Sequence, residues 1–214
     1  MVNLNELYLL NLALDGRDIF MLPKFTNVHM TNLLGSSVYS ALVAKGLMQD
    51  SENFTQEGAV FFKKVEQYKN AIKYVKIGPI IIGLYHESYA IALITDENTN
   101  SYNFKRIKYD NLIEQLYPAY PFLNTNHNSV SYSELNNPIS YYELKNRYSF
   151  KLDNALYLST LDMKLLREKK KDMVTNELLF HTEGMTYCYD FNLEKLSTCS
   201  PMQLQDLIKE RVTL

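Results

Sequence analysis

The side chains best able to do chemistry in this sequence are four histidines, two cysteines and scattered carboxylates. The histidines are His29, His86, His127 and His181. No two of them stand three or four residues apart, the spacing that places two metal ligands on one face of a helix, and no H-E-x-x-H motif occurs. His86 is followed by Glu87 in a segment typical of a turn, where a solvated pair is expected. The sequence therefore predicts no metal site.

The two cysteines, Cys188 and Cys199, are expected to be free thiols. Two cysteines in a chain of 214 residues are too few for a disulfide framework, and they do not form a C-x-x-C motif. Cys188 lies between Tyr187 and Tyr189 in a predicted strand, without the neighbouring cations or helix N-terminus that produce a reactive thiolate. We expect both cysteines to be structural.

Motifs for nucleophilic catalysis and phosphoryl transfer are absent as well. There is no G-x-S-x-G and no set of kinase motifs, and the seven glycines form no phosphate-binding cluster. Gly35-Ser36-Ser37 occurs inside a helical pattern, without the preceding strand that a nucleophile elbow requires. We therefore expect no catalytic residues, no cofactor, and a protein that is not an enzyme.

Composition points to a packed globular protein. Of the 214 residues, 46% are hydrophobic and 21% are charged, and the net charge of −2 gives no overall attraction to nucleic acid or acidic lipid. The longest apolar stretch, Ile77–Tyr85, is far shorter than the roughly 20 residues that span a bilayer. The first residues lack the basic segment of a signal peptide. We expect a cytoplasmic protein without stable membrane insertion.

Periodicity predicts helices in the first part of the chain and strands after them. The helices are expected at Leu4–Asp15, at His29–Lys45, and from Thr55 onward, the last with an apolar face of Val60, Phe61, Val65, Tyr68 and Ile72. Strands are expected at Ile77–Tyr85, Tyr89–Thr95 and Tyr102–Ile107, with His86-Glu87-Ser88 as a hairpin turn and a short helix at Asp110–Leu116.

An Asn- and Ser-rich segment divides the sequence into two halves. Residues 124–138 are predicted to be a linker, because such side chains bond to their own backbone and disfavour regular elements. Residues 1–123 and 139–214 are then two halves of one compact domain. The second half is expected to contain a helix at Ser140–Tyr148, an ambiguous segment at Ala155–Leu166, a hairpin of Leu178–His181 and Met185–Phe191, a strand at Leu193–Thr198, and a helix capped by Ser200.

The two halves present similar elements in a similar order. Each contains a hairpin, a third strand and a helix, which favours an α+β fold with an antiparallel sheet, flanking helices and a possible quasi-two-fold symmetry. The alternative is that a hairpin followed by a helix is simply a common unit.

One stretch is similar to winged-helix regulators. Leu42–Met48 followed by Phe54–Gly58 has their L-x-x-K-G-L … L-T-x-x-G rhythm, and the helix expected there carries Lys63, Lys64, Lys69, Lys73 and Lys76, which could contact phosphates. Gln56, Glu57 and Glu66 are interleaved with these lysines, and the chain is net acidic. A winged-helix-like DNA-binding transcriptional regulator is therefore the alternative function.

Over nearly its full length, the order of segments resembles one family. A Leu-rich helix precedes Asp18–Pro23, a helix ends in Lys45–Met48 before Thr55–Gly58, a hairpin contains Tyr89–Ala92, and a late strand begins with Gly184–Tyr187. In this order the chain resembles the EspG-like chaperones of type VII (ESX-type) secretion, especially EsaE-like members from low-GC Gram-positive bacteria. It is shorter than the actinobacterial members, lacks Trp and is rich in Asn and Lys, so their particular substrates are not transferred.

This resemblance implies an α+β fold with quasi-two-fold symmetry and no catalysis. It also implies a cytosolic chaperone that binds a helical secreted protein, either a toxin or a small helical-hairpin protein, keeps it soluble and delivers it to the secretion ATPase. Tyrosines suit such a surface, because they bury apolar area and keep a polar tip in water.

The candidate partner-binding residues lie around the predicted sheet ends and on one helix, and the alternative for each tyrosine is a place in the core. They are Tyr85, His86, Glu87, Tyr89, Asp96, Glu97, Asn98, Tyr141 and Tyr142, with Tyr187 and Tyr189 as further candidates.

Overall fold

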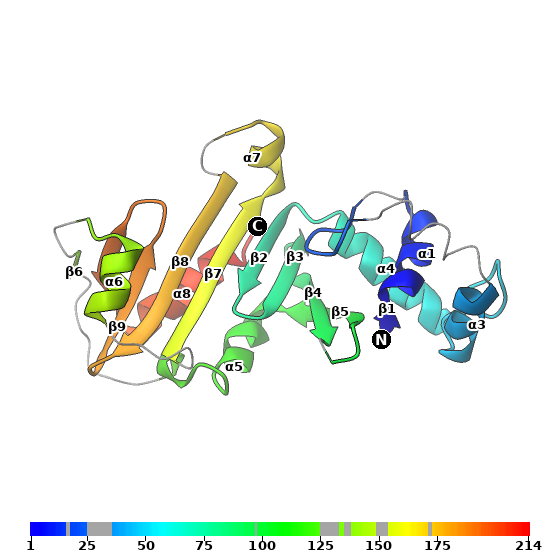
Figure 1. Cartoon of the computed structure of the whole chain (residues 1–214), viewed down its shortest axis with the longest axis horizontal. Coiled ribbons are helices and arrows are strands. Elements are labelled where there is room, and N and C mark those ends of the chain that lie inside the picture. Colours follow the sequence, from blue (N-terminus) through cyan, green and yellow to red (C-terminus); the bar gives the residue numbers. More distant parts are fainter. Residues whose placement is uncertain are drawn as a thin grey trace. The chain divides into compact units, whose positions relative to one another are not determined.

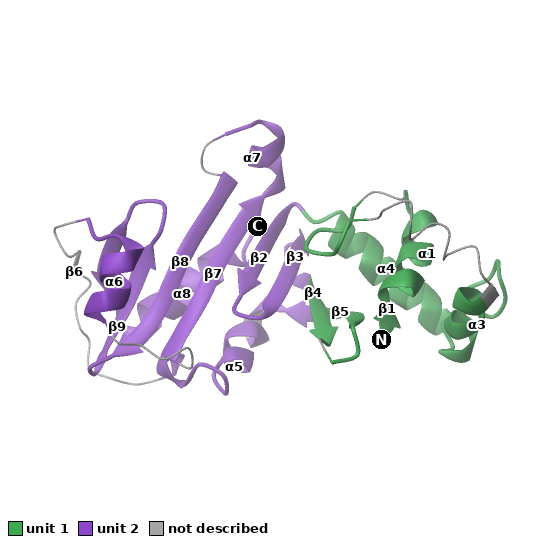
Figure 2. Cartoon of the chain, viewed as in Figure 1, with its two compact units in different colours: residues 1–71, 91–106 green, residues 72–90, 107–214 purple. Residues whose placement is uncertain are grey.

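A computed structural model describes residues 1–15, 18–24, 36–96, 98–124, 133–134, 138–148, 154–170 and 173–214. The chain has a mixed α+β fold with antiparallel strand pairs, as the sequence predicts (Figure 1). It divides into two compact units (Figure 2). Unit 1 comprises Met1–Ala71 and Ile91–Arg106, and unit 2 comprises Ile72–Ala90 and Ile107–Leu214.

Unit 1 is mainly helical. Its elements are β1 (Val2–Asn3), α1 (Leu4–Leu12), α3 (Ser36–Ala44), α4 (Gln56–Lys69), and most of β4 (Tyr89–Asp96) and β5 (Ser101–Lys108). β1 pairs antiparallel with β5. The start of α1 is fixed by a capping box, in which the Glu6 N–H donates to Asn3 Oδ1 over 2.9 Å and the Asn3 N–H donates to Glu6 Oε2 over 2.8 Å.

The core of unit 1 forms where α4 meets β5. The rings of Phe61 and Tyr68 lie 6.0 and 5.3 Å from the ring of Phe104. The Tyr68 hydroxyl donates to the carbonyl of Phe20, which attaches the segment after α1 to α4. The predicted apolar face of α4 is wrong at its margins, since Val60 is 52% exposed and Ile72, beyond the helix, is 49% exposed.

The segments Leu42–Met48 and Phe54–Gly58 form the end of α3, the turn after it and the start of α4. Gly46 has φ of 69°, which favours glycine, and its carbonyl accepts from the Thr55 hydroxyl. The Gly58 N–H donates to the Thr55 Oγ1 atom over 3.0 Å and caps α4. A Cβ atom on Gly58 would lie 1.7 Å from the carbonyl oxygen of Leu47. The motif therefore packs one helix start closely on the preceding turn.

Unit 2 is built on an antiparallel sheet in the order β3-β2-β7-β8-β9-β10-β6. Its strands are β2 (Lys73–Ile77), β3 (Ile80–His86), β6 (Ser133–Glu134), β7 (Ala155–Asp162), β8 (Val174–Thr182), β9 (Met185–Asp190) and β10 (Lys195–Thr198). Its helical elements are η1 (Tyr109–Asn111), α5 (Leu112–Leu116), η2 (Pro121–Leu123), α6 (Tyr141–Arg147), α7 (Met163–Arg167) and α8 (Pro201–Arg211).

Helices α6 and α8 cover opposite faces of this sheet (Figure 1). On the α6 face, a buried cluster joins Leu144 to residues of β8, β9 and β10, including Phe180 and Tyr189. The Tyr189 hydroxyl donates to the carbonyl of Ile139 over 2.9 Å, which fixes the chain before α6. On the other side, α8 buries Leu204 and Ile208.

The structure refines three expectations for unit 2. The strand expected at Ile77–Tyr85 is two strands, β2 and β3, because Gly78 has φ of 55° and forms the turn between them. The ambiguous Ala155–Leu166 segment is first a strand and then the short helix α7, which begins where Asp162 Oδ1 accepts from two backbone N–H groups. The predicted linker contains β6, which pairs with β10.

Some predictions fall outside the described residues. The start of the helix expected at His29–Lys45 lies in 25–35, and most of the 124–138 segment lies in 125–132 and 135–137. The division into halves at that segment stays a prediction.

Candidate functional site

The predicted site at the β3–β4 turn is held by side-chain hydrogen bonds within unit 2. The Tyr109 hydroxyl donates to the carbonyls of His86 over 2.7 Å and Tyr89 over 3.1 Å, and burial raises the pKa of Tyr109 to about 12. The rings of His86 and Tyr89 are stacked at 4.8 Å. Tyr85 is 41% exposed, and Glu87 is exposed as well. The turn thus presents polar and aromatic groups on a fixed backbone.

The second predicted site, after β4, belongs to unit 1. The Asp96 carboxylate accepts from the Asn98 N–H over 3.0 Å and from the Thr99 hydroxyl over 2.7 Å. The bond from Thr99, the larger cause, and that from Asn98 hold the pKa of Asp96 below its usual value. Glu97 lies outside the described residues. These bonds shape the turn itself.

The third predicted site, on α6, is part of a larger aromatic surface, which we define as Tyr141, Tyr142, Tyr157 and Phe191. The Phe191 ring lies 5.2 Å from that of Tyr141 and 5.8 Å from that of Tyr157. Tyr141, Tyr142 and Tyr157 are 44%, 76% and 38% exposed. The further candidates Tyr187 and Tyr189 belong to the buried cluster beneath α6.

The β3–β4 turn and the aromatic surface are separated along the sheet of unit 2. Tyr85 follows Leu84, which pairs with Lys73 at the start of β2. Tyr157 precedes Leu158, which pairs with Ile77 at the end of β2. The two groups therefore lie at opposite ends of one strand, and the structure does not bring them together.

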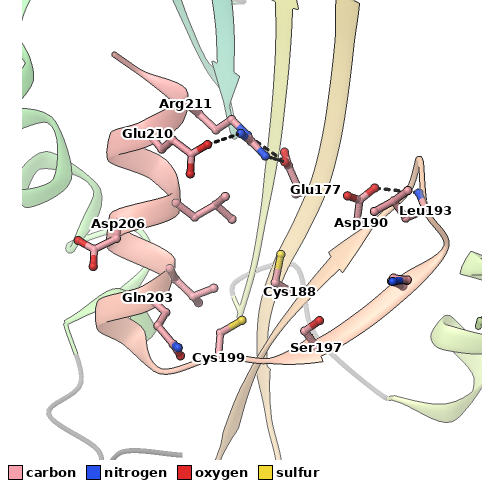
Figure 3. A pocket seen from close by; sticks show the side chains of 13 residues that line it. Glu177, Cys188, Asp190, Leu193, Ser197, Cys199, Gln203, Asp206, Glu210 and Arg211 are labelled. Carbon is pink, nitrogen blue, oxygen red and sulfur yellow. Dashed lines mark hydrogen bonds and ion pairs between the residues drawn. The ribbon is translucent and has the colours of Figure 1, made fainter. Parts of the chain in front are cut away.

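A cavity that the sequence did not indicate lies between α8 and strands β8, β9 and β10 (Figure 3). We call it the α8 cavity; its volume is about 420 Å³. It is lined by Glu177, Cys188, Asp190, Leu193, Lys195, Ser197, Cys199, Gln203, Leu204, Asp206, Leu207, Glu210 and Arg211. The strand residues share one face because Glu177 pairs with Asp190 and Cys188 pairs with Ser197.

Glu177 is the most deeply buried carboxylate of the α8 cavity, at 2% exposed. Its Oε1 atom accepts from Arg211 Nη2 over 2.6 Å and from Arg211 Nε over 3.0 Å. Within the described part of the chain, its Oε2 atom is buried and has no hydrogen-bond partner. Burial raises the pKa of Glu177, and the contacts with Arg211 oppose that rise in part.

The two cysteines meet in the same cavity. Both are free thiols, as predicted. Interaction with the Cys199 thiol and burial raise the pKa of Cys188, whereas interaction with the Cys188 thiol lowers the pKa of Cys199. Sequence reasoning treated the two residues separately, and only the pairing of β9 with β10 reveals that they are neighbours.

A protein-family model matches nearly the whole chain. The family model described as "Domain of unknown function (DUF5081)" covers residues 1–213. The chain belongs to this family. None of the curated proteins matches the sequence.

The lysine series expected on one helix of this DUF5081 chain is divided by the fold. Helix α4 ends at Lys69, and Lys73 and Lys76 lie in β2. The Lys69 ammonium forms an ion pair with Asp15, and Lys73 Nζ donates to the carbonyl of Thr213 over 3.2 Å. The expectation of five lysines along one helix is therefore wrong, which weakens the case for DNA binding.

The described residues contain neither a metal-binding cluster nor a membrane-spanning helix. Among the described residues of the DUF5081 chain, no three His, Cys, Asp or Glu side chains form a group that could hold a metal ion. His86 is exposed and His181 is partly buried, while His29 and His127 lie outside the described ranges. Over those same ranges, no helix has the length and hydropathy to cross a bilayer.

Proposed function

We propose that this DUF5081 chain is a non-catalytic cytoplasmic adaptor or chaperone that binds a helical protein and delivers it to a type VII (ESX-type) secretion machine. The quasi-two-fold arrangement implied by the family resemblance is part of the same proposal. The observation that carries the proposal is the aromatic surface on unit 2, where three tyrosines expose a large fraction of their side chains beside Phe191.

The chemistry of this surface suits a protein partner. Tyrosine rings bury apolar area while the hydroxyl stays hydrated, which makes them frequent at interfaces. An amphipathic helix offers apolar residues at i, i+3, i+4 and i+7 that can pack against such rings. The Tyr142 ring projects from α6 and is the most exposed member, so we expect it to be the central anchor.

The aromatic surface is also preorganised. Ser140 and Glu143 form a capping box at the start of α6, with the Ser140 N–H donating to Glu143 Oε2 over 3.0 Å. The Tyr157 hydroxyl donates to Asn176 Oδ1 over 2.8 Å, which fixes its ring on the sheet. Side chains that are already ordered lose less conformational entropy when a partner binds.

Site-specific photocrosslinking in the native cells tests the proposal. A benzophenone amino acid would replace Tyr142 in one variant, Tyr85 in a second, and Met202 in a third. Met202 is a matched control, because it is 71% exposed but lies on α8, away from the aromatic surface. We expect one secreted helical protein to be crosslinked from position 142 and not from position 202.

Two further measurements test whether the crosslinked protein is the partner: its binding to the purified chain, and its export in cells that lack the chain. It must bind the purified full chain, with affinity reduced at least about tenfold by Tyr142→Ala, and its extracellular amount must fall when this chain is deleted while its transcript is unchanged. Equal crosslinking from positions 142 and 202, or normal export without the chain, contradicts the proposal. If the chain binds duplex DNA with an affinity that falls steeply as the salt concentration rises, the winged-helix alternative is supported.

A further inference from the structure

We propose that the α8 cavity binds an organic cation, an ammonium or guanidinium group on a short apolar chain, with Glu177 as its charged acceptor. This inference is independent of the proposed function, because the cavity lies on the α8 face of the unit 2 sheet and the aromatic surface includes α6.

The first argument is the unsatisfied oxygen of Glu177. Burying a carboxylate oxygen without a donor is unfavourable, so native proteins rarely retain one without a reason. Arg211 directs two N–H groups to Oε1, whereas Oε2 has no donor among the described residues. A ligand N–H group placed in the cavity would supply that donor.

The second argument is charge. The cavity is lined by four carboxylates and two basic side chains. One of the basic groups, Arg211, is already shared between Glu177 and Glu210, at 2.6 and 3.1 Å. Asp190 pairs with Glu177 across the strands and contributes to raising the pKa of Glu177, so a second negative charge lies close by. This balance favours a cation over an anion.

The third argument is shape and polarity. A volume of about 420 Å³ is within the range of small-molecule sites. Leu204 and Leu207 of α8 and Leu193 supply apolar walls, and the thiols of Cys188 and Cys199 add weak, polarizable contacts. An apolar chain of a few carbons fits such walls, with its charged end directed to Glu177 and Asp190.

Titration of the isotopically labelled full chain with matched probes tests this inference. The probes are n-butylguanidinium, n-pentylamine, neutral 1-pentanol and anionic pentanoate, each followed by amide chemical shifts. We expect both cations to give saturable shifts at residues 177, 188–190 and 197–199, and the alcohol and the anion to give none. A capped Ala-Ala-Arg-Ala peptide distinguishes the source: tighter binding than butylguanidinium indicates an arginine side chain of a polypeptide, and weaker binding indicates a free small molecule.

Three variants make the test specific. Glu177→Gln keeps the side-chain volume and should weaken cation binding at least about tenfold, because a hydrogen bond to a charged acceptor is lost. Asp190→Asn should weaken cation binding by a smaller factor. It tests the same cavity if Glu177→Gln fails to fold. Glu183→Gln, in the exposed β8–β9 turn, is the control and should bind as the wild type does. Absence of saturable binding by the cations, equal binding of the alcohol, or unchanged affinity in both cavity variants overturns the inference.

Discussion

The Arg211 Nη2 atom, in the last turn of α8, lies 2.6 Å from the Oε1 atom of Glu177 in β8. The two residues are separated by 34 positions in the sequence. Their ion pair attaches the final helix to the sheet, and a basic residue in the last turn of a helix also interacts favourably with the helix dipole. Because the Glu177 side chain is only 3% exposed, neither partner can be removed without leaving a poorly solvated charge or altering its pKa.

Replacing Arg211 should therefore be costly. We expect Arg211→Met to lower the free energy of unfolding by about 3 kcal/mol, since it leaves the Glu177 carboxylate buried without its counter-charge. In a Glu177→Gln background, the same replacement should cost much less, and urea denaturation of the four proteins measures the difference. Lys209→Met, in the same helix turn with a 59% exposed side chain, is the control and should change stability by less than about 0.5 kcal/mol. Equal effects of Arg211→Met in both backgrounds would show that the pair is not coupled.

Titration of Glu177 should contribute to the pH dependence of the free energy of unfolding. Burial raises the pKa of this carboxyl in the folded chain above its ordinary value of 4.5. The folded state therefore keeps the proton to higher pH than the unfolded state, and this group's contribution to stability is full below pH 4.5 and is lost as pH rises through the folded pKa. Glu177→Gln should abolish that decline, measured as the difference between the two unfolding profiles from pH 4 upward. A difference that grows in favour of the wild type with rising pH would show that the folded pKa is lowered instead.

Tyr85 and Tyr189 were both predicted as partner-binding candidates, but their replacement by alanine should affect stability differently. Tyr85→Ala should cost less than about 1 kcal/mol, because the side chain is 41% exposed. Tyr189→Ala should cost about 3–5 kcal/mol, because the ring is 1% exposed and the substitution leaves a cavity in the cluster beneath α6. Chemical denaturation of both variants checks this expectation. A loss above about 3 kcal/mol for Tyr85→Ala would place that residue in the core and remove it from the candidate surface.

Reductants and chelators should leave thermal stability unchanged. Cys188 and Cys199 are free thiols, so the fold does not depend on a disulfide between them. The described residues also contain no cluster of metal-binding side chains. We expect the same melting temperature with dithiothreitol, with EDTA and with neither, with a Cys188→Ser/Cys199→Ser variant as a thiol-free reference. A drop of several degrees in the melting temperature with either reagent would reveal a bond or an ion that supports the fold.

Local features of the fold were predictable from the sequence, and features that depend on strand pairing were not. The start of α8 was identified because Ser200 and Gln203 form a capping box whose members are three residues apart. Thr55 was likewise predicted as the residue that caps the start of α4. By contrast, β2 was missed because its Lys-containing sequence alternates weakly, and its place in the sheet comes from pairing with β7, more than 70 residues away.

In the candidate sites, too, local features were predictable from the sequence and features that depend on strand pairing were not. Tyr141 and Tyr142 were predicted as partner-binding candidates, but their association with Tyr157 and Phe191 needs the sheet register and the packing of α6. The α8 cavity had no local signal, because its central ion pair joins two distant residues and the strand pairings that unite its walls are set by the whole sheet.

The last prediction concerns Gly58, where two effects of opposite sign compete. Within a helix, replacing Gly by Ala normally stabilises a protein by about 0.5–1 kcal/mol, because the unfolded chain loses conformational freedom. Here the new Cβ would lie 1.7 Å from the Leu47 carbonyl oxygen, a backbone atom that cannot rotate away. To relieve the contact, α4 must move from the turn that Thr55 joins to Gly46, and overpacking of this kind costs about 1–3 kcal/mol or more.

The steric effect should win, so Gly58→Ala is expected to lower the free energy of unfolding by about 2 kcal/mol. The neighbouring Glu57→Ala variant is the control, since Glu57 is exposed in the first turn of α4 and should change stability by less than about 0.5 kcal/mol. Urea denaturation measures both, and amide exchange in residues 46–58 should be faster only in Gly58→Ala. A stabilised Gly58→Ala protein would mean that the turn and the helix start are farther apart than the structure places them.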